Sequence, residues 1–411
     1  MEKVLKSSKK IIFLSLVQID TLSDRGIYHD LLRQFVSNGH EVSVVCPVER
    51  RTGLATRIIT ESGTTILQVR TLNLQKSPIW EKGLATVTLN FLMKVAIKRY
   101  LSATSFDLIL YATPPITLTG LIHWLKIRYG AKTYLLLKDI FPQNAVDIGI
   151  FSKKSVWYRY FRNQELLLYA LSDKIGCMSP ANVQYVIDDQ PYLRGKVEVN
   201  PNSVDLTRIL NFEIDRNALL AQWDIPKDAL IFLYGGNLGK PQGTPFLLNL
   251  IQKCEDHSKA YFLIVGDGTD YSVLSSWFKD HKPKRAKLIN RLPKDDYDKL
   301  AAICDVGIIL LRREFTIPNF PSRLLTYLEN RIPILAITDK TSDVGTIAEA
   351  EGFGKWCLYG QEDDAFRSIQ FFEMHNDLRN EMGQRGFDFM SRSYDVKDSY
   401  LKIFNFMNQF V

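Results

Sequence analysis

The feature that most constrains this chain is a regular alternation of short apolar runs with longer segments of helical periodicity. Strands buried on both faces read as near-continuous apolar runs, and helices between them allow the strands to pair in parallel. In the first half, the expected strands lie at residues 11–17, 41–46, 64–69, 108–111, 132–137, 174–177 and 196–199. The expected helices lie at residues 26–37, 84–100, 116–129 and 155–171. The pattern predicts an α/β fold with a doubly wound parallel sheet.

The turn-rich segment Asn200-Pro201-Asn202-Ser203 interrupts this alternation, and the same pattern then restarts. Expected strands follow at residues 230–234, 261–265, 306–311 and 332–337, with helices at 245–253 and 322–328. A length of 411 residues also suits two or three domains. We therefore expect two Rossmann-like domains, 1–202 and 203–395, that face a cleft and bind ligands at the carboxyl ends of their strands.

Positive charge is concentrated in the first half of the chain. Residues 1–200 hold 26 Lys and Arg against 16 Asp and Glu, a net charge of +10, whereas the remainder carries −3. Such a balance favours an anionic partner, either phosphate groups or an anionic membrane surface, and the alternative is a solvated basic face. No nucleic-acid-binding signature accompanies the charge, so nucleic acid is the weaker option. The segment 76–100 mixes apolar and basic residues and could lie in a membrane interface or form an ordinary core-facing helix.

Several chemical classes are excluded by missing motifs. The five cysteines are far apart, and no CxxC or HExxH spacing occurs, so neither a metal centre nor a redox pair is expected. No apolar run approaches the ~18 residues of a membrane-spanning helix. We expect a cytoplasmic protein that is soluble or peripheral to the inner face of the cell membrane.

The glycine-rich stretch at residues 234–243 follows an expected strand and precedes an expected helix. Glycines such as Gly236 let the backbone approach a phosphate, and Lys240 supplies a positive charge. The stretch is neither a Walker A loop nor a GxGxxG fingerprint. A purely structural turn is the alternative.

A second motif surrounds Pro321, which suits the first turn of a helix. Ser322 and Arg323 fall in the same turn, so free N–H groups, a hydroxyl and a guanidinium would converge where an anion could bind. Asn319 could cap this helix or bind the ligand. The alternative is a capped core helix that leads into a buried strand.

Two further motifs follow expected strands of the first domain. Asp139 comes directly after a buried strand, where a carboxylate can serve as a base or orient an acceptor, and Lys138 is its neighbour. An N-cap or a Lys138–Asp139 salt bridge is the alternative. Gly26 opens the first helix and could let a substrate lie against the backbone, whereas His29, one turn later, could equally be an ordinary helix-face residue.

Taken together, these residues resemble the GT-B glycosyltransferases of family 4, in the branch of bacterial O-antigen and capsule enzymes that includes fucosaminyl transferases. The resemblance covers nearly the whole chain and depends on the order and spacing of its marks. These are Gly26, residues 38–42, Thr113-Pro114-Pro115, residues 139–142, Ser179, residues 199–205, residues 234–239, Gly266-Asp267-Gly268, Pro321-Ser322-Arg323 and residues 332–335.

The resemblance implies a nucleotide-sugar donor held mainly by the second domain, no metal or other cofactor, and retention of the anomeric configuration. It also implies that a last helix, at about 396–411, packs back on the first, acceptor-binding domain. Thr326 stands where the family often has a glutamate, and Asn237 where it has a phosphate-binding arginine. The implied donor-binding residues are Gly236, Asn237, Lys240, Gly266, Arg291, Asn319, Pro321, Ser322, Arg323 and Thr326. The implied acceptor-binding residues are Gly26, His29 and Thr113, and the catalytic residues are Asp139 and Lys138.

The expected activity is transfer of a sugar, such as an N-acetylhexosamine or its deoxy variant, from a UDP-sugar to a polyprenyl-diphosphate-linked or oligosaccharide acceptor. Arg323, Ser322 and Lys240 would stabilise the leaving diphosphate. The alternative is a GT-B scaffold that has lost catalysis and serves a polysaccharide assembly complex. A GT-B sugar-nucleotide epimerase is a third and weaker hypothesis.

Overall fold

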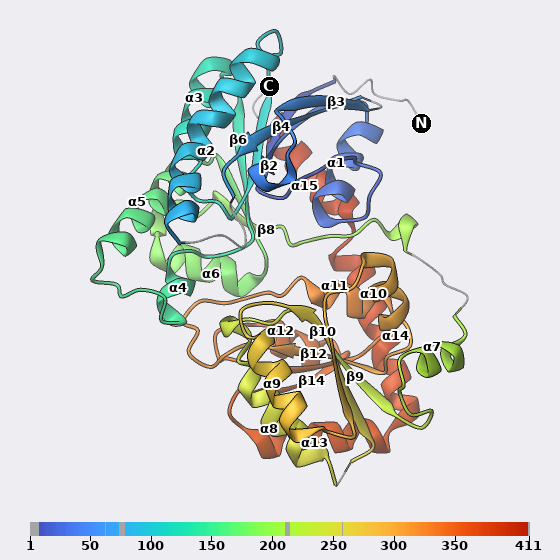
Figure 1. Ribbon diagram of the computed structural model, residues 1–411. Helices are drawn as coiled ribbons and strands as arrows, with labels where there is room; N and C mark the ends of the chain where they lie inside the picture. The colour runs from blue at the N-terminus through green and yellow to red at the C-terminus, as the bar shows by residue number, and fades with distance from the viewer. Residues whose placement is uncertain (1–7, 62, 74–78, 210–213, 257, 410–411) are drawn as a thin grey trace. The chain divides into compact units, whose positions relative to one another are not determined.

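The computed structural model describes residues 8–61, 63–73, 79–209, 214–256 and 258–409, and it divides the chain into two compact units (Figure 1). Unit 1 comprises Met1–Asp205 together with Asp395–Val411, and unit 2 comprises Leu206–Tyr394. The chain therefore leaves unit 1 once and returns to it for its last helix.

Unit 1 is built on an eight-stranded sheet in the order β3-β4-β2-β1-β5-β6-β7-β8. The sheet is parallel except for the edge strand β3, which runs antiparallel to β4. Strand β1 pairs with β2 on one side and with β5 on the other, so the winding direction reverses between β1 and β5. The strands are β1 (Lys10–Leu14), β2 (Glu41–Glu49), β3 (Arg57–Glu61), β4 (Thr64–Thr71), β5 (Leu108–Ala112), β6 (Lys132–Leu137), β7 (Lys174–Cys177) and β8 (Val197–Val199).

Helices cover both faces of this sheet. On one face α3 packs against both α2 and α5, and on the other α1 packs against α15 (Figure 1). The apolar side of α15 joins the core formed by β1, β2 and α1, where Ile403 is fully buried. The helices are α1 (Ile27–Ser37), α2 (Ile79–Tyr100), α3 (Thr119–Tyr129), α4 (Gln143–Asp147), α5 (Val156–Leu171), α6 (Pro180–Asp189) and α15 (Val396–Asn408).

Unit 2 is built on a six-stranded parallel sheet in the order β11-β10-β9-β12-β13-β14. Here the winding reverses between β9 and β12. The strands are β9 (Leu230–Asn237), β10 (Ala260–Asp267), β11 (Ala286–Ile289), β12 (Val306–Leu310), β13 (Ile334–Thr338) and β14 (Gly354–Leu358). The helices are α7 (Arg216–Gln222), α8 (Thr244–Cys254), α9 (Tyr271–His281), α10 (Lys294–Ala301), α11 (Arg323–Glu329), α12 (Val344–Ala350), α13 (Glu362–Met374) and α14 (Asn376–Ser393).

The α/β class and the two doubly wound sheets are as the sequence predicts, but several element bounds differ. Strand β1 ends at Leu14 rather than at residue 17, and the antiparallel strand β3 was not expected. Strand β9 continues to Asn237, three residues beyond the expected end, because it stays paired with β10. Residues 76–78 of the segment 76–100, and residues 410–411 of the expected last helix, lie outside the described residues.

Candidate functional site

The candidate donor site of unit 2 lies at the carboxyl ends of β9 and β10, next to the point where the winding reverses. Gly236 and Gly266 are paired in register there, and a Cβ on Gly266 would lie 1.8 Å from the carbonyl oxygen of Gly236. Gly236 has a φ of 116°, a conformation that favours glycine. Gly236 thus belongs to a strand end rather than to the loop that the sequence predicted, and the two glycines leave bare backbone at this edge.

Arg323 brings a positive charge to this edge, where Asp267 ends β10. A Cβ built on Gly236 would lie 3.6 Å from Arg323 Nη2, and the Arg323 guanidinium lies over the Tyr234 ring, 4.4 Å from its centroid. Arg323 Nη1 is buried and has no hydrogen-bond partner among the residues that the structure describes. A guanidinium is always charged, so a buried, unsatisfied N–H on it favours an anion at this position.

Two tyrosines that the sequence analysis did not identify hold this edge together. The Tyr327 hydroxyl lies 3.0 Å from the carbonyl oxygen of Leu233 and accepts a hydrogen bond from the Gly235 N–H at 3.3 Å. The Tyr297 hydroxyl occupies the space that a Cβ on Gly235 would need, at 1.9 Å. Burial raises the pKa of both tyrosines, so both remain neutral. In the sequence, these contacts are indicated only by Gly235, which precedes Gly236, and two successive glycines occur in many turns.

The remaining candidates of the glycine stretch, Asn237 and Lys240, are exposed, and so is Arg291. Asn237 ends β9 and donates from Nδ2 to Gln242 Oε1 at 3.3 Å, so its side chain orders the following turn. Lys240 is exposed at the start of the short 3-10 helix Lys240–Gln242. Arg291 is exposed two residues after β11, where its backbone N–H donates to Asn290 Oδ1 at 2.7 Å.

The Pro321 motif opens α11, which begins at Arg323 rather than at residue 322. Ser322 is the N-cap residue and is exposed, and its side chain makes no capping hydrogen bond. Asn319 is fixed by its loop, since its N–H donates to Ser342 Oγ at 2.9 Å and its Nδ2 to the Ile317 carbonyl at 3.3 Å. Thr326 is half-buried on the first turn of α11.

In unit 1 the candidate catalytic residues follow β6, which pairs with β5, the strand next to the point where the winding of this sheet reverses. Thr113, directly after β5, is buried, and its Oγ1 accepts from the backbone N–H groups of Lys138 and Asp139 at 3.0 and 3.2 Å. Thr113 therefore fixes the backbone that carries the two residues, instead of offering its own hydroxyl to a ligand. The structure brings these three residues together, a contact that the sequence analysis did not predict.

Asp139 and Lys138 have separate partners and do not form the alternative salt bridge with each other. Asn144 Nδ2 donates to Asp139 Oδ1 at 2.8 Å, and burial raises the pKa of the Asp139 carboxyl. Lys138 Nζ donates to the carbonyl oxygen of Asn200 at 3.1 Å, and burial lowers the pKa of its amine to about 7. Burial thus moves the pKa of each group towards neutral pH, while the two side chains face different partners. A carboxylate with a raised pKa is suited to taking up a proton.

Asn200, in the turn-rich segment where the sequence predicts the domain boundary, connects Lys138 to the last helix. Its Oδ1 accepts from Ser399 Oγ of α15 at 2.6 Å, and its Nδ2 donates to the Tyr134 hydroxyl at 2.9 Å. A Cβ on Gly176 would lie 2.7 Å from the Asn200 Cβ, so this close packing requires glycine. The returning helix thus supports the backbone oxygen that Lys138 contacts.

The acceptor candidates Gly26 and His29 lie at the start of α1. Gly26 is the N-cap residue, and a Cβ there would lie 2.7 Å from His29 Nδ1, so the imidazole covers the glycine backbone. His29 is half-buried, and this burial lowers the pKa of its ring. The structure therefore pairs these two residues with each other.

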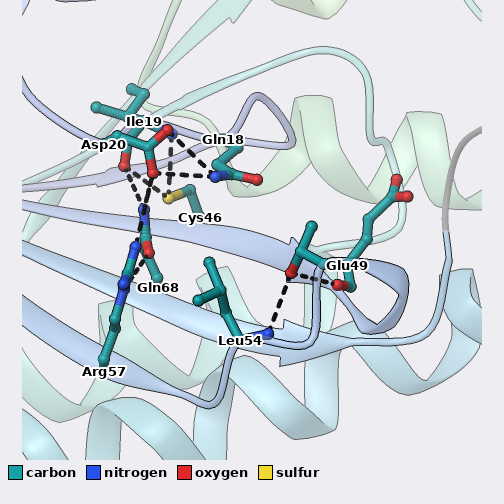
Figure 2. A network of polar contacts seen from close by, with 9 residues as sticks. Gln18, Ile19, Asp20, Cys46, Glu49, Leu54, Arg57 and Gln68 are labelled. Carbon is teal, nitrogen blue, oxygen red and sulfur yellow. Dashed lines mark hydrogen bonds and ion pairs between the residues drawn. The ribbon is translucent and has the colours of Figure 1, made fainter.

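The loop between β1 and α1 is fixed by hydrogen bonds from the buried side-chain amide of Gln68 on β4. Gln68 Nε2 donates to the Ile19 carbonyl at 2.9 Å and to Asp20 Oδ1 at 2.6 Å, while Arg57 Nε donates to Gln68 Oε1 at 2.8 Å (Figure 2). Cys46 lies against the same loop, with its Sγ 3.5 Å from the Ile19 nitrogen. These contacts connect the loop that leads to Gly26 with β2 and β4.

Among the residues that the structure describes, no cluster of three or more His, Cys, Asp or Glu side chains could hold a metal ion. No helix in the described part of the chain has both the length and the apolar character needed to cross a membrane.

Comparisons with known families match both units. The model of Glycosyltransferase Family 4 matches residues 27–208, and the model of Glycosyl transferases group 1 matches residues 215–389. A relative named as the probable glycosyltransferase WbjE of Pseudomonas aeruginosa is 27% identical over 290 residues, 69% of each chain. WcaI of Escherichia coli (strain K12), named as a colanic acid biosynthesis glycosyl transferase, is 24% identical over 46% of this chain and 47% of its own.

Solved structures share the fold across nearly the full length. The structure of Anabaena Alr3699/HepE in complex with UDP and glucose superposes with a TM-score of 0.70 at 14% identity, covering 97% of this chain and 99% of that one. A trehalose-6-phosphate protein of E. coli bound with UDP-2-fluoro glucose gives a TM-score of 0.73 at 11% identity, covering 98% and 99%. Because two glycosyltransferase family models match successive units of this fold, the chain belongs to the GT-B glycosyltransferases of family 4 and is a glycosyltransferase.

Proposed function

We propose that the protein is a retaining, metal-independent glycosyltransferase that moves a sugar from a UDP-linked donor to a lipid-linked or oligosaccharide acceptor in bacterial surface polysaccharide synthesis. Unit 2 would bind the donor and unit 1 the acceptor. The sugar would be an N-acetylhexosamine or its deoxy variant. The UDP complex of HepE and the name of WcaI support the donor class and the pathway class.

The proposal depends mainly on the position of Arg323. Its guanidinium is fixed on Tyr234, keeps an unsatisfied Nη1 among the described residues, and lies beside the bare backbone of Gly236. When a glycosidic bond to a nucleotide breaks, negative charge develops on the leaving diphosphate. A preorganised cation and nearby N–H groups at that place stabilise the transition state. Ser322 and Lys240 would add donors from the exposed side, and Asn319 and Thr326 would contact the sugar or the ribose.

The donor assignment is tested by thermal unfolding of the purified protein with UDP, GDP, ADP and dTDP. A ligand that binds only the folded state raises the unfolding temperature by mass action. We expect a shift with UDP that Arg323→Ala abolishes and Arg323→Lys reduces, because lysine cannot form the two-pronged contact. Arg385→Ala, which removes an exposed ion pair with Glu381 in the same unit, is the control and should keep the shift. An undiminished UDP shift in Arg323→Ala would contradict the assignment.

On the acceptor side, we propose that Asp139 orients and deprotonates the attacking hydroxyl, with Lys138 setting the local charge. The raised pKa of Asp139 suits a base, and Asn144 fixes one carboxylate oxygen. Asp139→Asn should lower kcat by about 10²–10⁴-fold, the usual contribution of general acid–base catalysis, while leaving the UDP shift intact. Loss of both properties would point to a structural role instead.

The assignment as a retaining enzyme depends on the family resemblance, and NMR of the product tests it. After a single transfer, the coupling constant of the anomeric proton should indicate the same anomeric configuration as in the donor sugar. An inverted product would contradict the retaining assignment without affecting the donor or acceptor assignments.

The second candidate is a member of this family that has lost catalysis and serves as a scaffold. It is favoured by one observation, since Thr326 stands where the family often has a glutamate. An enzyme of this kind hydrolyses its donor slowly when no acceptor is present, because water reaches the same centre. Release of UDP from a UDP-sugar, lost in Arg323→Ala, would support the transferase. UDP binding without any release, with or without acceptor, would support the scaffold.

A further inference from the structure

An exposed apolar surface lies where α4 is followed by α5 in unit 1. Ile150 is 62% exposed, Val156 76% and Trp157 67%, all within eight residues. Single exposed apolar residues are ordinary, but three of them within eight residues of sequence, one a tryptophan, favour an interaction site. We name this the α5 surface and define it by Ile150, Lys153, Lys154, Val156, Trp157 and Arg159.

All the exposed charge on the α5 surface is positive. Residues 148–164 contain four Lys and Arg and no Asp or Glu. Arg162 turns inward and pairs with Glu165 and Asp189, whereas Lys153, Lys154 and Arg159 are exposed. The three exposed residues make no ion pair within the part of the chain that the structure describes. The positive end of the α5 helix dipole lies at the same place.

The α5 surface is preformed and linked to the proposed acceptor site. The Phe141 ring packs against the Phe161 ring of α5, with 5.0 Å between the ring centroids, and against the Phe151 ring, with 6.0 Å between the centroids. The hydroxyl of Ser155 caps α5 by accepting from the Tyr158 N–H at 3.1 Å. Phe141 lies two residues after Asp139, so the segment that carries the candidate base is packed directly on the helix that presents this surface.

We propose that the α5 surface docks on an anionic phospholipid bilayer, with Trp157 and Val156 in the interfacial region and Lys153, Lys154 and Arg159 against the headgroups. Tryptophan with basic residues on one exposed face is the composition of an interfacial anchor. The inference rests on the proposed function for its meaning, since it would place Asp139 next to lipid-linked acceptors.

A bilayer suits the surface better than a second copy of the chain. A two-fold contact would bring the same basic residues of both copies face to face, without a carboxylate between them. The surface also differs from the segment 76–100 that the sequence analysis considered. On α2, Lys94 and Lys98 lie over the Trp124 ring at 5.3 and 5.5 Å and so are engaged within the protein.

Flotation of the full-length protein with lipid vesicles tests the proposal without donor or acceptor. One vesicle preparation contains phosphatidylglycerol in phosphatidylcholine, and the other contains phosphatidylcholine alone. We expect the protein to float with the phosphatidylglycerol vesicles at low salt, to be released as NaCl increases, and to stay behind with phosphatidylcholine alone. No flotation with anionic vesicles at low salt would overturn the proposal.

Matched variants locate the contact. Each juxtamembrane basic residue contributes about fivefold to membrane affinity, so Lys153→Ala with Lys154→Ala should weaken binding on the order of 25-fold. Trp157→Ala should weaken it by at least about fivefold. The controls, Lys279→Ala with Lys284→Ala and Val273→Ala, remove exposed residues of the same kinds from unit 2 and should not change binding. An equal loss in the controls would overturn the proposal.

Two further readouts separate the outcomes. The UDP-induced thermal shift should be unchanged in every α5-surface variant, so loss of vesicle binding is not loss of folding. An absent UDP shift with normal vesicle binding would contradict the donor assignment but not this inference. If sedimentation instead shows a dimer that Trp157→Ala dissociates while vesicle binding persists, the surface is a contact between copies and the proposal is wrong.

Discussion

Lys138 is held where its charged form is disfavoured. Burial lowers the pKa of its amine from the ordinary 10.5 to about 7. Between these pH values the unfolded chain binds a proton that the folded protein does not, so the contribution of Lys138 to the free energy of unfolding increases with pH. Below a pH of about 7, Lys138 is protonated in both the folded and the unfolded state. The cost of burying its charge then lowers the free energy of unfolding by its full amount. We expect Lys138→Met to be more stable than the wild type at neutral pH, with the difference shrinking towards pH of about 10.

Urea unfolding across this pH range measures that difference directly. Lys279→Met, which removes an exposed lysine from unit 2, is the control and should leave the pH dependence unchanged. A difference between wild type and Lys138→Met that stays constant with pH would mean that Lys138 remains fully charged in the fold.

The positions of the charged residues in the candidate site could be predicted better than the contacts that support them. Asp139 was expected just after a buried strand and Arg323 in the first turn of a helix, and the structure places them after β6 and at the start of α11. Their roles stay predictions. Tyr297 and Tyr327 could not be predicted, since their hydroxyls reach Gly235 from helices more than sixty residues away in sequence. Thr113 was assigned to the acceptor, but its hydroxyl binds backbone N–H groups.

At the scale of elements, the apolar parts of the interior strands were predicted closely, whereas some strand ends and the edge strand β3 were not. The bounds of β6 and β7 match the expected residues 132–137 and 174–177, because continuous apolar runs mark interior parallel strands. Strand β3 is at an edge of the sheet, is mostly exposed and is mixed in composition, so no apolar run in the sequence predicts it. Strand β9 extends into its glycines because pairing with β10, a long-range contact, outweighs the low strand propensity of glycine.

The last helix should be a structural part of unit 1 and not an appendage. Ile403 of α15 is fully buried in the core around β1 and α1, whereas Leu401, two residues earlier, is 42% exposed. Ile403→Ala should lower the free energy of unfolding of unit 1 by about 2–5 kcal/mol, through lost burial and the cavity left behind. Leu401→Ala should lower it by less than about 0.5 kcal/mol. Equal effects on denaturant unfolding would show that α15 does not pack as described.

At the scale of the molecule, the order of the chain separates the two proposed binding functions. Unit 2 is one continuous segment, Leu206–Tyr394, inserted between Asp205 and Asp395. The insertion points adjoin each other within unit 1, where the Val396 N–H donates to the Val204 carbonyl at 3.0 Å. A short glycine linker from Asp205 to Asp395 should therefore give a unit 1 that folds alone, and residues 206–394 should fold as a second protein.

These two proteins allow the donor and acceptor assignments to be tested separately. If Arg323, Tyr234 and the paired glycines form the diphosphate site, isolated unit 2 should keep the UDP-induced thermal shift, and linked unit 1 should show none. A version of unit 1 ending at residue 205 lacks the part of the core that α15 supplies and should unfold at a lower temperature than the linked version. If UDP stabilises only the full chain, residues outside unit 2 contribute to donor binding, and the assignment of the donor to unit 2 alone is wrong.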